Sequence, residues 1–525
     1  MRHFPTLSPK SKLIGFALIV LASLMLFAQW HYGFNWSDEG FLWYGSQRTA
    51  LGEVPFRDFF SYDPGRYYWS ALVFKTFGRD GLFEQIVADD LFGVIGLLAC
   101  YFAMARAGIR LAWRAAILFV LAVMMGFPRY KIYEQSLSLF SAIGIAFLIS
   151  RKPTSRDWFA FGILTGLAAF MGRNSGLYFA VAAVVTLILL KPANEKIHRV
   201  RLLAALSAGV CVGYAPMLYM MARVRGFAAA FIHSLSFLES LLPLPIPFPW
   251  QMNTVGLQGI DLLQAVAVSL LCLVVPLTYG YLMLKWRTSK PCFNGAYTMA
   301  CGAAIAGLPY LHHAFGRADF FHIAAAVLPF ALAAGALGAH LWEMEKRRSA
   351  IVILVSLVAL IVAAWLPREP AFSYRRLEGM RPELVERMEI SGRNFAVPAY
   401  QAQVMRAVKD EFRRCGGGDG NFLAAPHYPG LYAFLRTRAP FWEVYYLFPR
   451  NEDFQARHID AIIKSGTSLV LINPDATVDG QERLRIDKTY PQLVDYIHTH
   501  FERLEPDTLP DHFELYYLPN KCSGG

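Results

Sequence analysis

In LIGFALIVLASLMLFAQWHYGFNWSDEG, residues 13–40, an uninterrupted apolar run ends in two adjacent carboxylates. The apolar part, 13–30, has the length that crosses a hydrocarbon core about 30 Å thick. The run is too long for the core of a signal peptide, and no clean small-residue cleavage site follows it, so we expect a retained membrane anchor. The sequence therefore predicts that Asp38 and Glu39 stand where the chain leaves the membrane.

The composition is that of a membrane protein. Of 525 residues, 55% are hydrophobic and only 17% are charged, which is less charge than a soluble protein of this length carries. The net charge of +11 does not predict nucleic-acid binding, because most Lys and Arg lie in short loops where membrane topology requires them. We expect a polytopic α-helical membrane protein with about eleven transmembrane helices. The predicted spans are 13–30, 85–105, 115–127, 137–150, 158–172, 175–190, 202–222, 262–284, 295–311, 323–341 and 350–366.

The charges of the loops predict the orientation. With the N-terminus in the cytoplasm, every inner loop is short and basic, whereas the outer segments are longer and mixed in charge. The odd number of spans then places the C-terminus outside. We expect an integral protein of a bacterial inner membrane whose C-terminal domain is periplasmic or extracellular. The predicted domains are 1–366, a transmembrane domain with a long first outer loop at 31–84, and 367–525, a small extracytoplasmic α/β domain.

The C-terminal domain is predicted from two alternating patterns. Amphipathic helical stretches at 398–415, 454–466 and 490–504 alternate with short apolar runs at 421–426, 468–474 and 513–519. The glycine-rich stretch between the first helix and the first run does not follow a strand, so it is not a dinucleotide-binding fingerprint. Cys415 and Cys522 share this oxidising side of the membrane, and both a disulfide and two free thiols remain open.

The residues with chemical potential gather in the predicted outer segments, where no ATP or nucleotide sugar is present. Group transfer there needs a donor that is carried by a lipid. Asp38 and Glu39 allow three interpretations. They could form a solvated loop start or cap of a helix over 39–52, or provide a general base whose pKa is raised beneath an amphipathic helix lying on the membrane surface. They could also hold a metal or the acceptor hydroxyl. Their position at the predicted membrane boundary favours the catalytic interpretation.

The next stretch, GEVPFRDFFSYDPGRYYW at 52–69, mixes charged and aromatic side chains around turns. It has the character of an aromatic belt with surface salt bridges, and also of a loop that shapes a groove for a lipid-linked ligand. We expect this stretch to act partly as an aromatic belt and partly as a ligand-binding loop. The candidate ligand-binding residues are Arg57, Asp58, Asp63 and Arg66.

Three other outer segments carry cations. HHAFGRADFFH at 312–322 combines Arg317, Asp319 and His322, a set that suits phosphate binding better than a plain charged cap on a helical hairpin. The outer turns at 127–135 and 172–176 supply further cations that could bind a lipid phosphate, contact headgroups or cap helices. These cations are Arg129, Lys131 and Arg173.

Two of these stretches resemble a known family. The acidic Asp38-Glu39 turn, followed by the G-x-x-P-x-x-D pattern of Gly52 to Asp58, resembles the first extracytoplasmic loop of the GT-C glycosyltransferases. The nearest branch is the group of protein O-mannosyltransferases and lipid A aminoarabinose transferases. The R-x-D-x-x-H pattern of 317–322 is similar to a loop of other GT-C relatives. The resemblance covers the architecture of the whole chain but specific residues only in 35–69 and 312–322.

The resemblance implies an inverting glycosyltransferase that uses a polyprenyl-phosphate sugar and acts on an envelope glycan, lipid or protein. It implies Asp38 as base, Glu39 as the residue that orients either Asp38 or the acceptor, and Arg317 and His322, with Arg173 as a further candidate, as partners of the leaving phosphate. Some GT-C members use a divalent cation, and the residues offer no ligand set beyond Asp38, Glu39 and Asp63. The only other expected partners are membrane lipids, and no nucleic acid is expected.

Two other classes of protein fit the same sequence. A flippase for lipid-linked sugars would need phosphate-binding cations too, although transporters tend to place functional polar residues near the middle of the bilayer. A non-catalytic protein of polysaccharide assembly would use its outer domain for binding alone. The sequence names neither the sugar nor the acceptor.

Overall fold

The computed structural model describes residues 9–151, 154–189, 195–239, 258–288, 295–478, 480–504 and 509–522. The chain divides into two compact units, each assembled from three segments. Unit 1 consists of Met1–Gln29, Val87–Arg223 and Pro245–Ser373. Unit 2 consists of Trp30–Ile86, Val224–Leu244 and Tyr374–Gly525.

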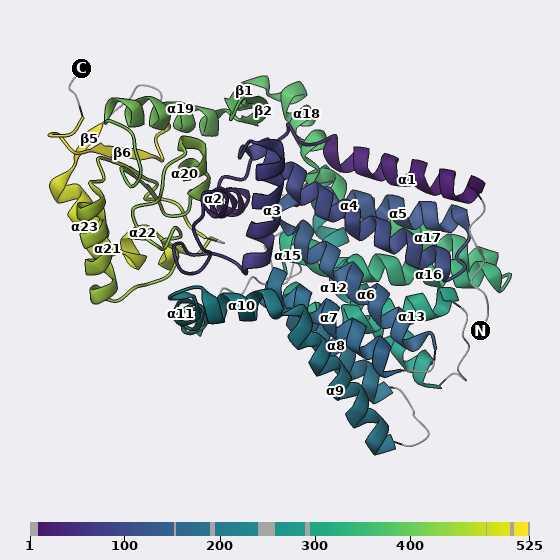
Figure 1. The fold of residues 1–525 in the computed structure, drawn as a ribbon. Helices are drawn as coiled ribbons and strands as arrows, with labels where there is room; N and C mark the ends of the chain where they lie inside the picture. The colour runs from purple at the N-terminus through teal and green to yellow at the C-terminus, as the bar shows by residue number, and fades with distance from the viewer. Residues whose placement is uncertain are drawn as a thin grey trace. The chain divides into compact units, whose positions relative to one another are not determined.

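Unit 1 is helical throughout its described part (Figure 1). Each predicted span falls on one helix or on two consecutive helices, because the apolar runs that cross a membrane are also helix formers. Large apolar side chains remain exposed along the helices, for example at Leu277 and Val352, as expected for surfaces that face lipid. The helices are α1 (Pro9–Phe27), α4 (Leu82–Arg106, which begins in unit 2), α5 (Leu111–Met125), α6 (Ile132–Ile149), α7 (Ser155–Met171), α8 (Arg173–Leu189), α9 (Glu195–Gly213), α10 (Ala215–Arg223), α12 (Gly259–Thr288), α13 (Gly295–Gly307), α14 (Leu311–Gly316), α15 (Phe320–Ala326), α16 (Leu328–Glu343) and α17 (Arg347–Trp365), with the 3₁₀ turns η1 (Arg129–Lys131) and η3 (Leu366–Arg368).

Within the described residues, four helical segments are long and apolar enough to cross a membrane. The number rises to six if each of two bent pairs, α9 with α10 and α15 with α16, forms one span. Three shorter apolar helices accompany them. The membrane character is thus supported, and the predicted number of about eleven crossings stays a prediction.

Glycines bring α7 and α9 into direct backbone contact. A Cβ atom on Gly162 of α7 would come within 2.2 Å of the Leu206 carbonyl oxygen, and one on Gly209 of α9 within 2.1 Å of the Phe159 carbonyl oxygen. Without an apolar driving force between helices in lipid, such small-residue contacts let van der Waals packing hold helices together.

Unit 2 combines helices with two small sheets (Figure 1). The predicted alternation of helices and strands is confirmed: α19, α21 and α23 match the three amphipathic stretches, and β3, β4 and β6 match the three apolar runs. The sequence did not predict β1, β2 and β5. The elements are α2 (Asp38–Ala50), α3 (Pro64–Phe77), α11 (Phe227–Glu239), α18 (Pro370–Met380, which begins in unit 1), η4 (Pro382–Leu384), β1 (Val385–Ile390), β2 (Arg393–Pro398), α19 (Ala399–Arg414), β3 (Phe422–Ala425), α20 (Pro429–Leu435), α21 (Glu452–Ser465), β4 (Leu469–Ile472), η5 (Glu482–Leu484), α22 (Ile486–Thr489), α23 (Pro491–His500), β5 (Glu502–Leu504) and β6 (Glu514–Tyr517).

The larger sheet has the strand order β3-β4-β6-β5, with β3 and β4 parallel and the other pairs antiparallel. Strands buried on both faces alternate their side chains between two cores. Leu469 and Leu471 of β4 face one core, whereas Val470 and Ile472 face a second core that includes residues of α21 and α23. A disulfide between Cys415 and Cys522 ties the end of α19 to the chain after β6, so the disulfide alternative is the one observed.

The first core also contains the segment predicted as the first outer loop. Phe34, Trp43 and Phe74 share this cluster with Val397 and Leu431 of the C-terminal chain. The smaller sheet makes a second connection, because residues 31–33 pair with β2 of the β1–β2 hairpin. The Gly33 N–H donates to the Ala396 carbonyl oxygen, and the Ala396 N–H donates to the His31 carbonyl oxygen, each at 2.8 Å. The first outer loop and the C-terminal chain therefore fold as one compact unit.

This packing corrects one expectation. The helix predicted over 39–52 forms as α2, but it is not an amphipathic helix lying on the membrane surface. Every residue from Glu39 to Thr49 is buried within unit 2. The hydrophobic periodicity of α2 does not reveal this burial, because a helix that is covered on all sides needs no apolar stripe.

His458 provides a test of the second core. Its ring lies between Phe441 and Tyr446 at centroid distances of 4.3 and 4.9 Å, and neither ring nitrogen has a hydrogen-bond partner in the described part of the chain. Burial lowers the pKa of His458 to about 3. Below the ordinary histidine pKa of about 6.5, the unfolded chain therefore takes up a proton that the folded protein excludes, and stability falls with pH from there towards pH 3.

We expect His458→Phe to raise the free energy of unfolding by about 1 kcal/mol at pH 7, because two unsatisfied polar atoms are removed. The gain in free energy of unfolding should be larger at pH 5, because only the wild-type protein is destabilised by protonation of residue 458 in the unfolded chain. Thermal unfolding of the purified protein at both values measures this. His500→Phe, at an exposed position, is the matched control. A His458→Phe variant that is less stable than wild type at both pH values would contradict the placement of His458 as a buried neutral ring without hydrogen-bond partners.

Candidate active site

The acid pair begins α2, and Asn35 holds both carboxylates. The Asn35 side-chain oxygen accepts hydrogen bonds from the backbone N–H groups of Ser37 and Asp38, each at 3.0 Å. The Asn35 backbone N–H donates to Glu39 Oε2 at 2.9 Å, and its side-chain amide donates to Asp38 Oδ2 at 3.4 Å. Negative charge is favoured at this position, since the N-terminus of a helix carries a partial positive charge.

The C-terminal chain holds this turn from the other side. Tyr445 donates its hydroxyl hydrogen to the Ser37 carbonyl oxygen at 3.0 Å, and the Gly430 N–H donates to the Trp36 carbonyl oxygen at 2.9 Å. Gly40 lies against Gly430 so closely that a Cβ atom on Gly40 would come within 2.5 Å of the Gly430 Cα atom. The position of the acid pair thus depends on residues about four hundred positions away in the sequence.

The two acids differ in accessibility. Glu39 is buried, with 6% of its surface exposed, whereas Asp38 is partly exposed. Asp38 is therefore the carboxylate that a ligand can reach, and Glu39 is fixed behind it.

His427 is a neighbour of Asp38 that the sequence did not predict. Burial lowers the pKa of His427 to about 4, and the charge of Asp38 opposes that effect. The ring stacks on Tyr428 at 5.4 Å, and its Nδ1 atom has no hydrogen-bond partner among the described residues. The short Pro-His-Tyr-Pro-Gly loop that carries it is the only signal in the sequence.

The charged residues of 52–69 largely satisfy one another. Arg57 donates two hydrogen bonds to Asp58, at 2.8 and 2.7 Å, and Asp58 Oδ2 also accepts the Val54 N–H at 2.7 Å. Burial alone would raise the pKa of Asp58, but the bonds from Arg57 and Val54 outweigh it and lower that pKa. This ion pair closes a turn, and the structural interpretation of the stretch holds for it.

Asp63 and Arg66 are both buried. Asp63 precedes the first residue of α3, Pro64, and the Arg66 guanidinium lies over the Tyr62 ring at 4.8 Å from its centroid. As ligand-binding residues, both stay predictions.

Unit 1 holds the remaining predicted residues, and several of them meet. Asp319 accepts the His322 backbone N–H at 2.9 Å, which caps α15, and its other oxygen lies 2.7 Å from His322 Nδ1. Burial would raise the pKa of Asp319, but His322 and then Arg317 outweigh it and lower that pKa. The three residues predicted to bind phosphate therefore interact through Asp319.

Lys131 joins the same neighbourhood from the turn η1. The pKa of His313 is lowered to about 4, first by burial and next by the positive charge of Lys131. His312 is fixed nearby, with its Nδ1 atom 3.0 Å from the Tyr178 hydroxyl of α8. We call Lys131, His312, His313, Arg317, Asp319 and His322 the basic cluster. It joins two of the predicted outer stretches.

Arg129 and Arg173 are placed differently. Arg129 is buried, donates to the Gln29 carbonyl oxygen at 3.2 Å, and opposes the burial that raises the pKa of Glu369 to about 7. Arg173 is the first residue of α8, the helix that also carries Tyr178. Roles for both in ligand binding stay predictions.

A divalent cation finds no ligand set in the described part of the chain, since no three His, Cys, Asp or Glu side chains gather there in a group that could hold a metal ion. Asp38, Glu39 and Asp63 accordingly do not fit as such a set.

No protein-family model and no curated protein match the sequence. Among solved structures, the crystal structure of ArnT from Cupriavidus metallidurans in the apo state matches 99% of this chain and 100% of its own length, with 14% identity and a TM-score of 0.51. The oligosaccharyltransferase of Archaeoglobus fulgidus, crystallised with zinc and sulfate, matches 87% of this chain and 68% of its own, with 13% identity and a TM-score of 0.44. The chain therefore shares the fold of ArnT, and the resemblance read from the loop motifs is confirmed at the level of the fold.

Proposed function

We propose that the protein is an inverting glycosyltransferase that moves a sugar from a polyprenyl-phosphate carrier to an envelope glycan, lipid or protein on the outer face of a bacterial inner membrane. The observation that carries the proposal is the accessible Asp38 beside the buried Glu39, both tied to Asn35. The fold shared with ArnT over the full length of both chains supports it, as does the resemblance of the loop motifs to the aminoarabinose transferase group.

The chemistry is a single displacement. Asp38 takes the proton of the acceptor hydroxyl, the acceptor oxygen forms a bond to the anomeric carbon, and the bond from that carbon to the phosphate oxygen breaks. The polyprenyl phosphate leaves with the electron pair, and the configuration inverts. One base suffices, whereas a retaining glycosidase needs a second carboxylate as nucleophile.

The leaving phosphate requires positive charge, and we assign this role to Arg317 and His322, with Arg173. Asp319 holds the Nδ1 atom of His322, so we assign the other ring nitrogen to the phosphate. Removing one charged contact to the developing phosphate should cost about 2–4 kcal/mol of transition-state stabilisation. Asp319 then acts as a positioning residue for His322.

Asp38 is tested as the base by removing its charge. In a transfer assay with protein in nanodiscs and a panel of polyprenyl-phosphate sugars with crude envelope acceptors, Asp38→Asn should lower the rate about 100-fold or more, because an amide cannot take the proton. Asp410→Asn, at an exposed acid on α19, is the matched control and should match wild type. Full activity in a folded Asp38→Asn variant would refute Asp38 as base.

The same assay separates the other classes of protein. A flippase or a binding protein would retain the lipid-linked sugar but transfer it to none of the acceptors. Donor binding without transfer by wild type would therefore favour those classes over an enzyme.

Asn35 bonds both to the start of α2 and to the two acids, so its two roles can be separated. Asn35→Ala should cost about 1 kcal/mol of stability, because the N–H groups of Ser37 and Asp38 lose their side-chain acceptor. It should also slow transfer at least about tenfold, because Asp38 loses the side-chain amide that orients it, whereas Glu39 keeps its bond from the backbone N–H. Asn451 caps α21 by accepting the Phe454 N–H at 3.0 Å, so Asn451→Ala should lose similar stability and keep its transfer rate. Equal transfer rates in the two variants would mean that Asn35 has only a structural role.

A further inference from the structure

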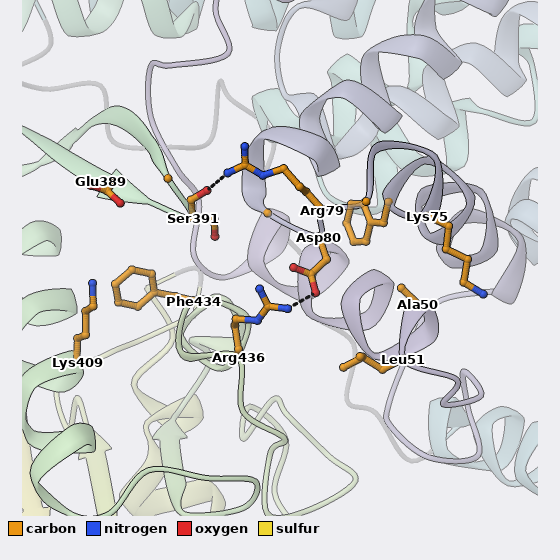
Figure 2. Close-up of a pocket in the computed structure, with 14 residues that line it drawn as sticks. Ala50, Leu51, Lys75, Arg79, Asp80, Glu389, Ser391, Lys409, Phe434 and Arg436 are labelled. Atoms are coloured by element: carbon orange, nitrogen blue, oxygen red, sulfur yellow. Dashed lines mark hydrogen bonds and ion pairs between the residues drawn. The ribbon is translucent and has the colours of Figure 1, made fainter.

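Unit 2 contains a cavity of about 520 Å³ whose lining includes neither acid of the pair nor His427. Its walls come from the C-terminal ends of α2 and α3, the loop that follows α3, the tip of the β1–β2 hairpin, α19 and the end of α20 (Figure 2). The volume lies within the range of about 300–1,000 Å³ that is usual for small-molecule sites. It is large enough for a ligand of one or two sugar rings.

The charge of the lining is positive. Four basic side chains, Lys75, Arg79, Lys409 and Arg436, face two acidic ones, Asp80 and Glu389, which leaves a formal excess of two positive charges. A concave surface with an excess of one sign of charge concentrates ligands of the opposite sign.

The two arginines build the walls. Arg79 donates to the Ser391 carbonyl oxygen at 3.2 Å and lies 3.7 Å from Glu84, and Arg436 pairs with Asp80 at 2.9 Å. Figure 2 shows the bonds of Arg79 to Ser391 and of Arg436 to Asp80. These contacts within the protein hold the walls of the pocket in place, so less conformational freedom is lost when a ligand binds.

The two lysines are different. Within the described residues, neither Lys75 nor Lys409 forms an ion pair with a carboxylate, and the Lys409 ammonium lies 5.6 Å from the centroid of the Phe434 ring. Figure 2 shows Lys409, Phe434 and Glu389 on one side of the pocket, and Lys75 on the other side. The pocket thus offers two cations without carboxylate partners, an aromatic ring and a carboxylate.

We propose that this pocket binds an anionic saccharide, a sugar or short glycan that carries a phosphate or a carboxylate. The lysine on each side of the pocket can meet an anionic group, Glu389 and the backbone of the glycine turns meet hydroxyl groups, and the Phe434 ring packs on the apolar face of a sugar ring. As part of the acceptor, this saccharide would define the substrate class of the transferase. That last assignment rests on the proposed function, whereas the binding itself does not.

The test measures binding to the full-length protein in zwitterionic nanodiscs by calorimetry. The probes are glucose 6-phosphate, digalacturonate and neutral maltose. We expect the two anionic probes to bind, more weakly as salt rises because charges at a surface are screened, and maltose not to bind. Lys75→Gln with Lys409→Gln should weaken the anionic probes about tenfold or more. Lys464→Gln, at an exposed position on α21, is the matched control and should bind as wild type does.

Three results would overturn the proposal. They are maltose binding as tight as that of the anionic probes, unchanged binding by the double lysine variant, and loss of probe binding in nanodiscs that contain phosphatidylglycerol, which would make a lipid headgroup the occupant. Thermal unfolding of the double variant checks that it is folded. Asp38→Asn should still bind the anionic probes, so a failure of transfer and a failure of this pocket give different results.

Discussion

The packing of the chain after the first membrane helix against the C-terminal chain is the constraint on which unit 2 depends. Phe34, Trp43 and Phe74 share one core with Val397 and Leu431, and Gly40 contacts Gly430 backbone to backbone. Interiors are packed as densely as organic crystals, so neither segment can shift without disturbing the other. The acid pair lies at the edge of this core, and the polar pocket is lined by the same two segments. The C-terminal chain is therefore part of what positions Asp38.

Much of this could be predicted from local pattern. The membrane helices follow from apolar runs, and β3, β4 and β6 with α19, α21 and α23 follow from changes between the two periodicities. The hairpin β1–β2 could not be predicted, because its strands mix charged and apolar residues, as in Val385–Ile390. The burial of α2 was missed for a related reason: its partners lie in the distant C-terminal chain, and helix periodicity reports only the local face.

The candidate site residues also divide into those that local sequence predicts and those that depend on tertiary contacts. Asp319 and His322 are close in sequence, and their interaction could be foreseen, whereas the addition of Lys131 depends on tertiary contacts. Arg57 and Asp58 were expected to pair or to bind a ligand, and in the structure they close a turn. The sequence did not indicate a role for His427, nor that Lys75 and Lys409 line the same pocket. The role of a single polar residue depends on the residues that surround it in the fold.

Amide hydrogen exchange in wild type and in Gly430→Val tests most directly that one core positions the acid pair. A Cβ atom at Gly430 would come within 2.6 Å of the Phe34 ring and 2.8 Å of the Trp36 carbonyl oxygen. If the account is right, the amides of α2 and of β3 and β4 lose protection together in the variant, since they belong to one cooperative unit. If α2 keeps its protection while the strands lose theirs, or the reverse, the acid pair is positioned independently of the C-terminal chain and the account is wrong.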